Sequence, residues 1–590
     1  MIIKADNIIR FLSAPIGNGN ALFFILMYMS GLTNIIFEPW NGSRVWMSLE
    51  LFSDLYLLCA FLLLIPDRMR HCARIILAVF FYLLSAIDMA CYVRLSVPIT
   101  PTLLQLLLQS NMREAGETLG SYMTGDMFGI PLNLVLLQSA AGIYILSRER
   151  TLTERLKHIF RNIPVKAKAT CRVMAFLLFA ACFMSSLENK GYMYYRIIRQ
   201  YSEVETIRVK EFSTNTHFYL PVYRLAFSMA ETERLGKEIS EFEASMGKAE
   251  IDSADHTSPH IIVIIGESYN KHHSPLYGYP KNTTPLQLER QRRGELVAFT
   301  DMISTWNMTS ESMKNIFSSH CIGQEGSWAS APPFPLLFRK AGYHTTFVSN
   351  QYVLGNNGFS DFSEDVFFNN PKTSRMLFDR RNSSTHDYDL SLIADYKALK
   401  NDKGAYRLDI FHLLGLHMDF SMRYTPGFRR FTAKDYTRPD LPESSRSIIA
   451  AYDNAVGYND FVLDSILKLF EKEDAIVIHV PDHGERVFDS SREWGRNLTW
   501  DKGDISQQFD IPFWIWGSAT YRTKHPELWA SIVRAAGKRG MTDTLPQILY
   551  HLAGIHTKWY YPEMDMLNDA YRNDRKRIIR NEKDYDGIMK

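Results

Sequence analysis

Cysteine is scarce in this chain, above all in its last two thirds. Six cysteines occur in 590 residues, and only Cys321 lies beyond residue 187. A disulfide needs two partners, so none can form within the part of the chain after residue 187. An excess of charge of one sign is also missing, because the formal net charge is only +2. That balance gives no reason to expect a nucleic-acid partner.

Long apolar runs, in contrast, fill the first third of the sequence. Five of them have about the ~20 residues that span a bilayer, although Glu50, Asp54 and Asp88 fall inside them. A cleavable signal peptide fits poorly, because no small-residue cleavage site follows the first run and further runs come after it. We therefore expect a polytopic membrane anchor. The five segments are 20–37, 47–66, 73–93, 130–147 and 170–187.

Basic residues beside these segments indicate the orientation of the anchor. They gather in the loop after the second segment and in the loop after the fourth, and Lys4 and Arg10 precede the first. Basic loops face the cytoplasm, so an odd number of spans places everything after residue 187 outside it. The loop residues are Arg68, Arg70, Arg74, Arg148, Arg150, Arg155, Lys157, Arg161, Lys166 and Lys168.

The length of the chain exceeds what one hydrophobic core usually supports, so several regions are expected. We assign residues 1–187 to the membrane domain, 188–250 to a linker and 251–590 to an extracytoplasmic catalytic domain. The linker contains one amphipathic helical stretch, residues 223–246. A connecting helix is the simpler interpretation of this stretch, and a helix lying on the membrane surface is the alternative.

From about residue 258 the pattern becomes strand, loop and helix in repetition. The strands read as continuous apolar runs, which is typical of a sheet covered by helices on both faces. Two helices that could cover it are 332–342 and 449–472. We therefore predict an α/β domain with a central sheet between helices. Its expected strands are 260–268, 344–351, 408–417, 475–485 and 509–517.

Polar residues end three of these apolar runs. Glu267 ends the first, His417 the third, and Asp482 with His483 the fourth. In such sheets, ligands bind beyond the carboxyl ends of the strands. One such residue alone is more often a surface or capping residue, but four at corresponding strand ends favour a metal site. Carboxylate and imidazole donors suit zinc, and manganese also fits them.

A hydroxyl nucleophile for this site is offered by the stretch 304–319. Apolar Met313, Ile316 and Phe317 have helical spacing, which places Thr309 at the N-terminus of a helix. Thr309 could simply cap that helix. It could also be a nucleophile, because backbone N–H groups and the helix dipole stabilise an alkoxide and a phosphate there. The rival hydroxyls are those of Ser268, Ser310 and Ser312.

An ordered set of motifs resembles the membrane-bound phosphoethanolamine transferases of the alkaline phosphatase and sulfatase superfamily. The resemblance covers nearly the whole chain, including a five-span anchor, and implies a sulfatase-like α/β fold. A single "DHG" would be weak, but the ordered set is specific. The motifs are "GES", "LYGYPKNTTP", "NMTSESMKNIFS", "GLHMDFSMRY", "YDNAVGYNDFVLDSIL" and "PDHGE".

The resemblance implies a role for several residues. Glu267, Thr309, Asp482 and His483 match zinc ligands of the family, and Thr309 also matches its nucleophile. His417 matches a histidine that binds the phosphoryl group or a second metal. The segment "LLQSNMREAGE" resembles a lipid-binding segment and "FVSNQ" one near the substrate. The residues implied there are Ser110, Glu114 and Asn350.

The chain also departs from better-known members of the family. Those members have disulfides in the catalytic domain, which this chain cannot form. Some carry a further histidine shortly after "DHGE", where this chain reads "WGRNLTW" with Arg496 and Asn497. These two residues are expected near the substrate phosphate, and a second metal is left open.

The implied activity is transfer of phosphoethanolamine from phosphatidylethanolamine to a lipid-linked glycan such as lipid A or lipopolysaccharide core. The enzyme would lie in the inner membrane, with its catalytic domain in the periplasm. A phosphoglycerol transferase of the lipoteichoic-acid-synthase kind is the alternative. A sulfatase fits less well, because no C/S-x-P-x-R motif surrounds Thr309. A sensor built on an inactive domain would need a broken ligand set, and this set is intact.

Overall fold

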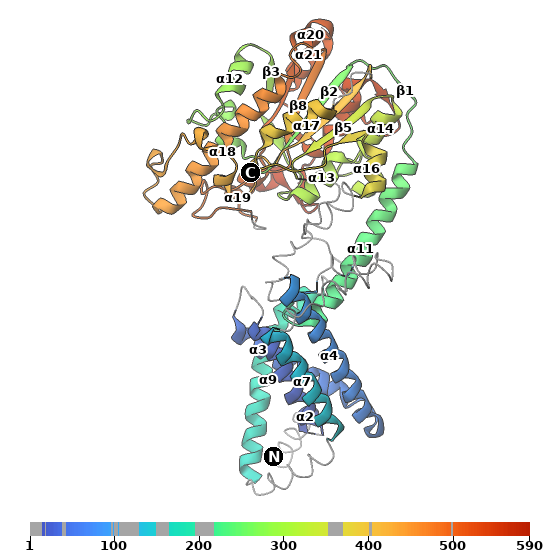
Figure 1. Ribbon diagram of the computed structural model, residues 1–590, viewed down its shortest axis with the longest axis vertical. Helices are drawn as coiled ribbons and strands as arrows, with labels where there is room; N and C mark the ends of the chain where they lie inside the picture. The colour runs from blue at the N-terminus through green and yellow to red at the C-terminus, as the bar shows by residue number, and fades with distance from the viewer. Residues whose placement is uncertain are drawn as a thin grey trace. The chain divides into compact units, whose positions relative to one another are not determined.

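The computed structural model divides into two compact units, Met1–Gly236 and Lys237–Lys590 (Figure 1). The division falls inside a long helix, α11 (Pro221–Gly247), which contains the amphipathic stretch of the expected linker. The structure describes residues 14–17, 19–37, 43–95, 98–99, 104, 129–148, 165–194, 218–351, 370–399, 404–496 and 500–590.

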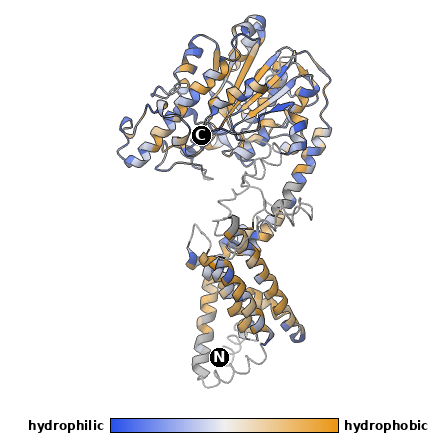
Figure 2. Cartoon of the chain, in the orientation of Figure 1, coloured by the Kyte–Doolittle hydropathy of each residue, from blue (hydrophilic) through white to orange (hydrophobic). Residues whose placement is uncertain are grey.

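Each of the five apolar segments expected to span the membrane overlaps a helix of the first unit, although 47–66 runs four residues past the end of its helix and 20–37 begins one residue before its helix. Among the described residues, α3, α4 and α7 are long and apolar enough to cross a bilayer, and α2 is a shorter apolar helix. Three spans are therefore supported, and five are not established. Figure 2 shows the apolar character of these helices. Their bounds are α2 (Ala21–Phe37), α3 (Arg44–Leu62), α4 (Asp67–Leu95), α7 (Ile130–Ser147) and α9 (Val165–Met193).

The acidic residues that interrupt the apolar segments all have basic partners. Asp88 and Arg224 form an ion pair in which both side chains are fully buried. Lys190 lies 2.7 Å from Glu50 and 2.5 Å from Asp54. A charge buried in apolar surroundings is costly unless it is paired. These pairs explain how helices that carry carboxylates can still pack into an apolar bundle.

The second unit is built on a seven-stranded mixed sheet, in the order β3-β9-β8-β2-β7-β5-β6. Strands β8, β2, β7, β5 and β6 are parallel, and β9 pairs antiparallel with β8 and β3. All five expected strands are present and lie next to one another, so the predicted α/β fold is confirmed for this unit. The bounds are β2 (His260–Gly266), β3 (Leu296–Phe299), β5 (His344–Ser349), β6 (Arg380–Arg381), β7 (Arg407–His412), β8 (Ala475–Pro481) and β9 (Phe513–Gly517).

Helices cover both faces of this sheet, as the apolar strands predict. In β2, Ile261, Val263 and Ile265 join one buried cluster with α13, α14 and α22. The alternate residues Ile262 and Ile264 join another with α17 and α18. Successive side chains of a strand point to opposite faces, so the continuous apolar run Ile261–Ile265 is what burial on both faces requires. The helices are α13 (Thr309–Phe317), α14 (Phe334–Lys340), α17 (Leu392–Leu399), α18 (Glu443–Leu467) and α22 (Leu545–Ala553).

Shorter elements complete the second unit. Three two-stranded sheets pair β1 with β11, β4 with β10, and β12 with β13. Their strands are β1 (Ser253–Ala254), β4 (Asp301–Ile303), β10 (Arg539–Met541), β11 (Ile555–His556), β12 (Ile578–Ile579) and β13 (Lys583–Asp584). The remaining α-helices are α12 (Pro285–Arg292), α16 (Pro371–Leu377), α19 (Lys502–Phe509), α20 (Ala519–Lys524), α21 (Pro526–Ala535) and α23 (Tyr585–Met589).

Several expected strands were drawn too long, and for the third this moves a predicted site residue away from the strand end. Strand β7 ends at His412, so His417 lies in a turn five residues beyond it rather than at its last position. The chain reverses at Gly415, whose φ of +51° lies in the left-handed region and cannot continue a strand. The apolar run "LDIFHLLGLH" therefore covers both a strand and the turn after it.

Candidate active site

Strand register brings two carboxylates to the same edge of the sheet. Gly266 at the end of β2 pairs with Pro481 at the end of β8, and the two strands are parallel. Glu267 and Asp482 follow these residues directly, and the Asp482 N–H donates to the Gly266 carbonyl at 3.0 Å. Parallel strands end together, so the two side chains leave the sheet at one level.

A cluster of four buried donor groups forms at this edge. Ligand atoms of Glu267, Asp482 and His483 all lie within 4.8 Å of one another. His483 Nε2 lies 3.5 Å from Glu267 Oε1 and 3.2 Å from Asp482 Oδ2. The Thr309 hydroxyl lies 3.0 Å from Glu267 Oε2 and 3.3 Å from His483 Nε2. Four groups from three separate parts of the chain thus converge on one point.

Thr309 is the first residue of α13, but it does not cap this helix. The N-cap position is Met308, which makes no side-chain capping hydrogen bond. The Thr309 hydroxyl instead donates to the Glu267 carboxylate. A capping hydroxyl would accept from the backbone N–H of its own first turn. The Thr309 side chain therefore contacts the carboxylate cluster and does not cap the helix.

The hydrogen bonds of His483 define which ring nitrogen can bind a cation. Nδ1 lies 2.7 Å from the Gly484 carbonyl, which can only accept, so Nδ1 carries the proton. Nε2 is then the acceptor nitrogen of the ring, and it accepts from Arg496 Nη1 at 2.9 Å. A ring N–H donated to a carbonyl, with the other nitrogen facing the site, is the usual arrangement of a metal-binding histidine.

The donor set fits zinc. Ligands held about 2.0–2.1 Å from a tetrahedral zinc ion lie about 3.3–3.5 Å from one another. The separations that His483 Nε2 makes with Thr309, Asp482 and Glu267 are 3.3, 3.2 and 3.5 Å. Burial and the nearby Glu267 carboxylate raise the pKa of Asp482 well above its usual range. A cation would relieve this repulsion, because it favours the ionised form of both carboxylates.

Basic side chains surround the carboxylates. Burial by itself raises the pKa of Glu267, but His483, His417 and Arg496 together hold its pKa below the usual range. Arg496 Nε also lies 3.7 Å from the buried carboxylate of Glu485. His417 and Arg496, both predicted to contact phosphate, are thus brought to the cluster, where their charges suit an anionic group.

Two residues orient Glu267, a role that the sequence did not predict for either of them, although Ser268 was named there as a rival hydroxyl. Ser268 has a φ of +56°, and this strained backbone lets its hydroxyl donate to Glu267 Oε1 at 2.6 Å while its N–H donates to Asp482 Oδ1 at 3.0 Å. Gln351 Nε2 donates to Glu267 Oε2 at 3.2 Å and to the Leu413 carbonyl at 2.7 Å. The one available signal was that Gln351 also follows a strand end, that of β5.

Two glycines let the backbone pack closely against the site. A side chain at Gly415 would place its Cβ 2.9 Å from the Glu267 nitrogen and 3.0 Å from its carbonyl oxygen. A Cβ at Gly484 would lie 2.3 Å from the Gln507 carbonyl oxygen. Contacts this short with backbone atoms are not tolerated. The glycine of the "DHG" motif is therefore required by the approach of α19.

The Asn350 amide is engaged at both ends by the protein. Its Nδ2 donates to Asp389 Oδ1 at 2.9 Å, and its Oδ1 accepts from the His386 N–H at 2.6 Å. Asp389 also accepts from the backbone N–H groups of Leu414 and Gly415. Asn350 thus helps to hold the turn that leads to His417, and its contact with substrate stays a prediction.

Three expected site residues, Ser110, Glu114 and Asn497, lie outside the described part of the chain. Of the rival hydroxyls, Ser268 binds Glu267, whereas the Ser312 hydroxyl donates to the Trp306 carbonyl at 2.9 Å. Ser310 is buried beside Thr309 on α13. Thr309 and Ser268 thus both donate a hydroxyl hydrogen bond to the Glu267 carboxylate.

Comparison with known proteins supports the resemblance read from the motifs. The protein-family model for Sulfatase matches residues 259–555. Phosphoethanolamine transferase EptC of Escherichia coli K12 is 23% identical over 569 residues, covering 95% of this chain and 93% of that protein. Kdo(2)-lipid A phosphoethanolamine 7''-transferase of Salmonella typhimurium is 24% identical over 293 residues, covering 48% of this chain and 49% of that protein. The chain is thus homologous to phosphoethanolamine transferases.

A solved structure shares the fold of the second unit. The crystal structure of the C-terminal periplasmic domain of EptC from Escherichia coli, in complex with Zn, is 24% identical to this chain with a TM-score of 0.50. It covers 57% of this chain and 95% of that domain. At this level of identity the likeness establishes the fold, and the assignment of each side chain depends on the geometry described above.

Proposed function

The chain belongs to the sulfatase family, and we propose that it transfers phosphoethanolamine from phosphatidylethanolamine to a lipid-linked glycan. Lipid A and the lipopolysaccharide core are the proposed acceptors. The proposal is supported by the homologous transferases, one of which is named for its action on Kdo(2)-lipid A. It is also supported by the cluster of Glu267, Thr309, Asp482 and His483.

One observation carries the proposal more than the others. The Thr309 hydroxyl, at the first position of α13, donates to Glu267 and lies 3.3 Å from His483 Nε2. A buried hydroxyl between a carboxylate and an imidazole, at a helix N-terminus, has the surroundings of an activated nucleophile. Helix capping does not account for Thr309, because the N-cap position of α13 is Met308.

In the first half of the proposed reaction, the Thr309 oxygen bonds to the phosphorus of the donor lipid. The bond between phosphorus and the diacylglycerol oxygen breaks, and diacylglycerol leaves with a proton. The Thr309 proton departs toward Glu267 Oε2, to which it is already hydrogen-bonded. Phosphoethanolamine stays on Thr309 as a phosphodiester. In the second half, an acceptor oxygen attacks the same phosphorus and the Thr309 hydroxyl forms again.

Glu267, Asp482, His483 and Thr309 would hold the zinc ion, and manganese suits the same donors. When bound, the metal supplies Lewis-acid polarisation and a lower pKa for a coordinated hydroxyl. The N-terminus of α13, His417 and Arg496 would stabilise negative charge on the phosphoryl oxygens. Among the described residues, one group of three or more His, Cys, Asp or Glu side chains could hold a metal ion. These residues therefore give no support for a second metal.

The proposed membrane anchor would keep the catalytic unit close to its lipid donor. We propose that all five apolar helices of the first unit span the inner membrane, and that the catalytic unit lies in the periplasm. The basic loops flanking the spans support this orientation. A catalytic unit tethered to the membrane meets lipid donors and lipid-linked acceptors at high local concentration.

A trapped intermediate tests the proposal. The full-length protein, incubated with phosphatidylethanolamine and no acceptor, should carry the mass of phosphoethanolamine on the peptide containing Thr309. The Thr309→Ala variant should carry none. A phosphoglycerol mass after incubation with phosphatidylglycerol would favour the alternative transferase. An adduct on Ser268, Ser310 or Ser312 would refute Thr309 as the nucleophile.

A further inference from the structure

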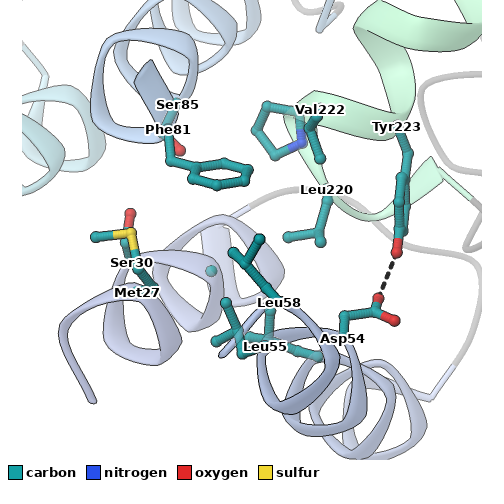
Figure 3. Close-up of a pocket in the computed structure, with 13 residues that line it drawn as sticks. Met27, Ser30, Asp54, Leu55, Leu58, Phe81, Ser85, Leu220, Val222 and Tyr223 are labelled. Atoms are coloured by element: carbon teal, nitrogen blue, oxygen red, sulfur yellow. Dashed lines mark hydrogen bonds between the residues drawn. The ribbon is translucent and has the colours of Figure 1, made fainter. Parts of the chain in front are cut away.

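The membrane unit contains a partly open cavity of about 190 Å³, lined by three helices, by Leu220 and by the start of α11 (Figure 3). Residues on one face of each helix line it, at the spacing that brings side chains together on a helix. In α3 the lining residues follow the pattern i, i+3, i+4 and i+7. The lining residues are Met27, Ser30 and Gly31 of α2, Leu51, Asp54, Leu55 and Leu58 of α3, Phe81 and Ser85 of α4, and Leu220, Pro221, Val222 and Tyr223.

Most of this lining is apolar, and a hydrocarbon chain would fill it. Figure 3 shows Leu55, Leu58, Phe81 and Leu220 around the central space. An apolar cavity of about 150 Å³ is already large enough to bind benzene, so this one accommodates a segment of an acyl chain. The outer faces of the same helices expose large apolar side chains, including Ile25 of α2. Lipid tails would surround such faces in a membrane.

One edge of the cavity is polar and holds a carboxylate. Asp54 Oδ2 accepts from the hydroxyl of Tyr223 at 2.5 Å and from that of Tyr219 at 2.6 Å. Lys190 lies between Asp54 and Glu50. These partners use three of the roughly four acceptor positions of the Asp54 carboxylate. Two carboxylates share one ammonium, so the group has a formal charge of −1.

We propose that this cavity binds one acyl chain of a phospholipid whose headgroup carries a primary ammonium, with the ammonium on Asp54. Such a headgroup supplies both a positive charge and N–H donors, which match the remaining acceptor capacity and the formal charge at this edge. A quaternary choline headgroup has no N–H to donate, and a glycerol headgroup has no positive charge. Ionisable groups inside a membrane bundle commonly mark such sites.

The choice of headgroup rests on the proposed function, because phosphatidylethanolamine is the proposed donor. The cavity and its carboxylate belong to the membrane unit and contain no residue of the candidate active site. Binding of lipid can therefore be measured separately from transfer. The Thr309→Ala variant serves this purpose, since it should transfer nothing and yet retain the lipid.

The test uses the full-length protein in nanodiscs that contain equal amounts of phosphatidylethanolamine and phosphatidylcholine. After mild extraction, native mass spectrometry counts the lipids that stay bound. We expect wild type and Thr309→Ala to retain one phosphatidylethanolamine in preference to phosphatidylcholine. Leu58→Trp should fill the cavity and remove this lipid. Leu137→Trp, at an exposed position of α7, is the matched control and should keep it.

Asp54→Asn tests the headgroup contact. Loss of one charge-assisted hydrogen bond should reduce the preference for phosphatidylethanolamine by about tenfold or more. The matched control Asp67→Asn, at the exposed start of α4, should leave the preference unchanged. Cross-linking of the wild-type protein with a photoreactive phosphatidylethanolamine tests the same site without variants, so its result does not depend on whether a variant folds. The acyl label of this lipid should cross-link to residues 51–58.

Three results would overturn the inference. Leu58→Trp could retain as much lipid as wild type, or the cross-links could avoid α2, α3 and α4, and either result would exclude the cavity as the acyl site. Equal retention of the two lipids by wild type would exclude the ammonium contact. If Thr309→Ala transfers phosphoethanolamine while the lipid results hold, the proposed nucleophile fails and the lipid site stands.

Discussion

Replacement of Gly415 by alanine should damage both the stability of the catalytic unit and its metal site. Gly415 has a φ of +51°, and a Cβ there would lie 2.9 Å from the Glu267 nitrogen, 3.0 Å from its oxygen and 3.1 Å from its Cβ. These are mostly backbone atoms of a strand end, which cannot rotate away as a flexible side chain can. Relief of the overlap must therefore move Glu267 or the turn that carries His417.

Two contributions set the expected loss of stability for Gly415→Ala. The left-handed conformation costs a residue with a Cβ about 1–2 kcal/mol. Overpacking of a tight site costs a further 1–3 kcal/mol or so. The sum is about 2–5 kcal/mol, a large part of the roughly 5–15 kcal/mol that stabilises a typical domain. A fall of roughly 3–7 °C in Tm should accompany it in a unit of this length.

Gly427→Ala is the matched control in the same stretch of chain. A Cβ at Gly427 would meet nothing within 4 Å, so the substitution should change stability by less than about 1 kcal/mol. Thermal unfolding of the full-length variants measures stability, and elemental analysis measures bound zinc. Gly415→Ala should lose zinc and transfer activity together, because both depend on the position of Glu267.

The reasoning would be refuted if Gly415→Ala unfolded at the wild-type temperature and kept full activity. A variant that lost stability but kept zinc and activity would show that the turn can move without Glu267. In that case the close approach would matter for folding only, and Glu267 would be held by Ser268 and Gln351.

Three further predictions concern the site and the anchor. Thr309→Ala should reduce transfer by at least about 10³-fold while changing stability by only about 1 kcal/mol, because no helix cap is lost. The control Ser312→Ala should stay active. An inactive Ser312→Ala would mean that changes in α13 abolish transfer through the structure of the helix. His483→Ala should lose most of its bound zinc in elemental analysis, and full retention would mean that the site is misassigned. A reporter fused after residue 250 should be active only outside the cytoplasm, and cytoplasmic activity would reverse the proposed orientation.

Much of the catalytic fold was predictable because its strands are buried on both faces. A strand covered on both sides is apolar at most positions, and runs such as His260–Gly266 and Ala475–Pro481 can therefore be recognised in the sequence. Polar residues directly after such runs, Glu267 and Asp482, were accordingly found together. The prediction failed where an apolar run continues past the strand, as it does between His412 and His417.

In the membrane unit, the sequence located the helices but did not establish how many of them span the membrane. Apolar composition located its helices, but length and hydropathy support only three spans among the described residues. Polar residues inside the apolar segments lower their apparent hydropathy, and the reason for their presence lies in partners far along the chain. Asp88 pairs with Arg224, and Glu50 with Lys190. A local window of sequence contains neither partner.

By itself the sequence determined the α/β class of the catalytic unit, the apolar first unit and the residue types at the strand ends, because each depends on neighbours within a few positions. Only the tertiary structure decided that Thr309 contacts Glu267 instead of capping its helix, and that Ser268 and Gln351 orient the same carboxylate. These contacts join residues brought together by strand order and by turns with left-handed backbone. Strand order and turn geometry are settled by packing of the whole domain, so no local pattern encodes them.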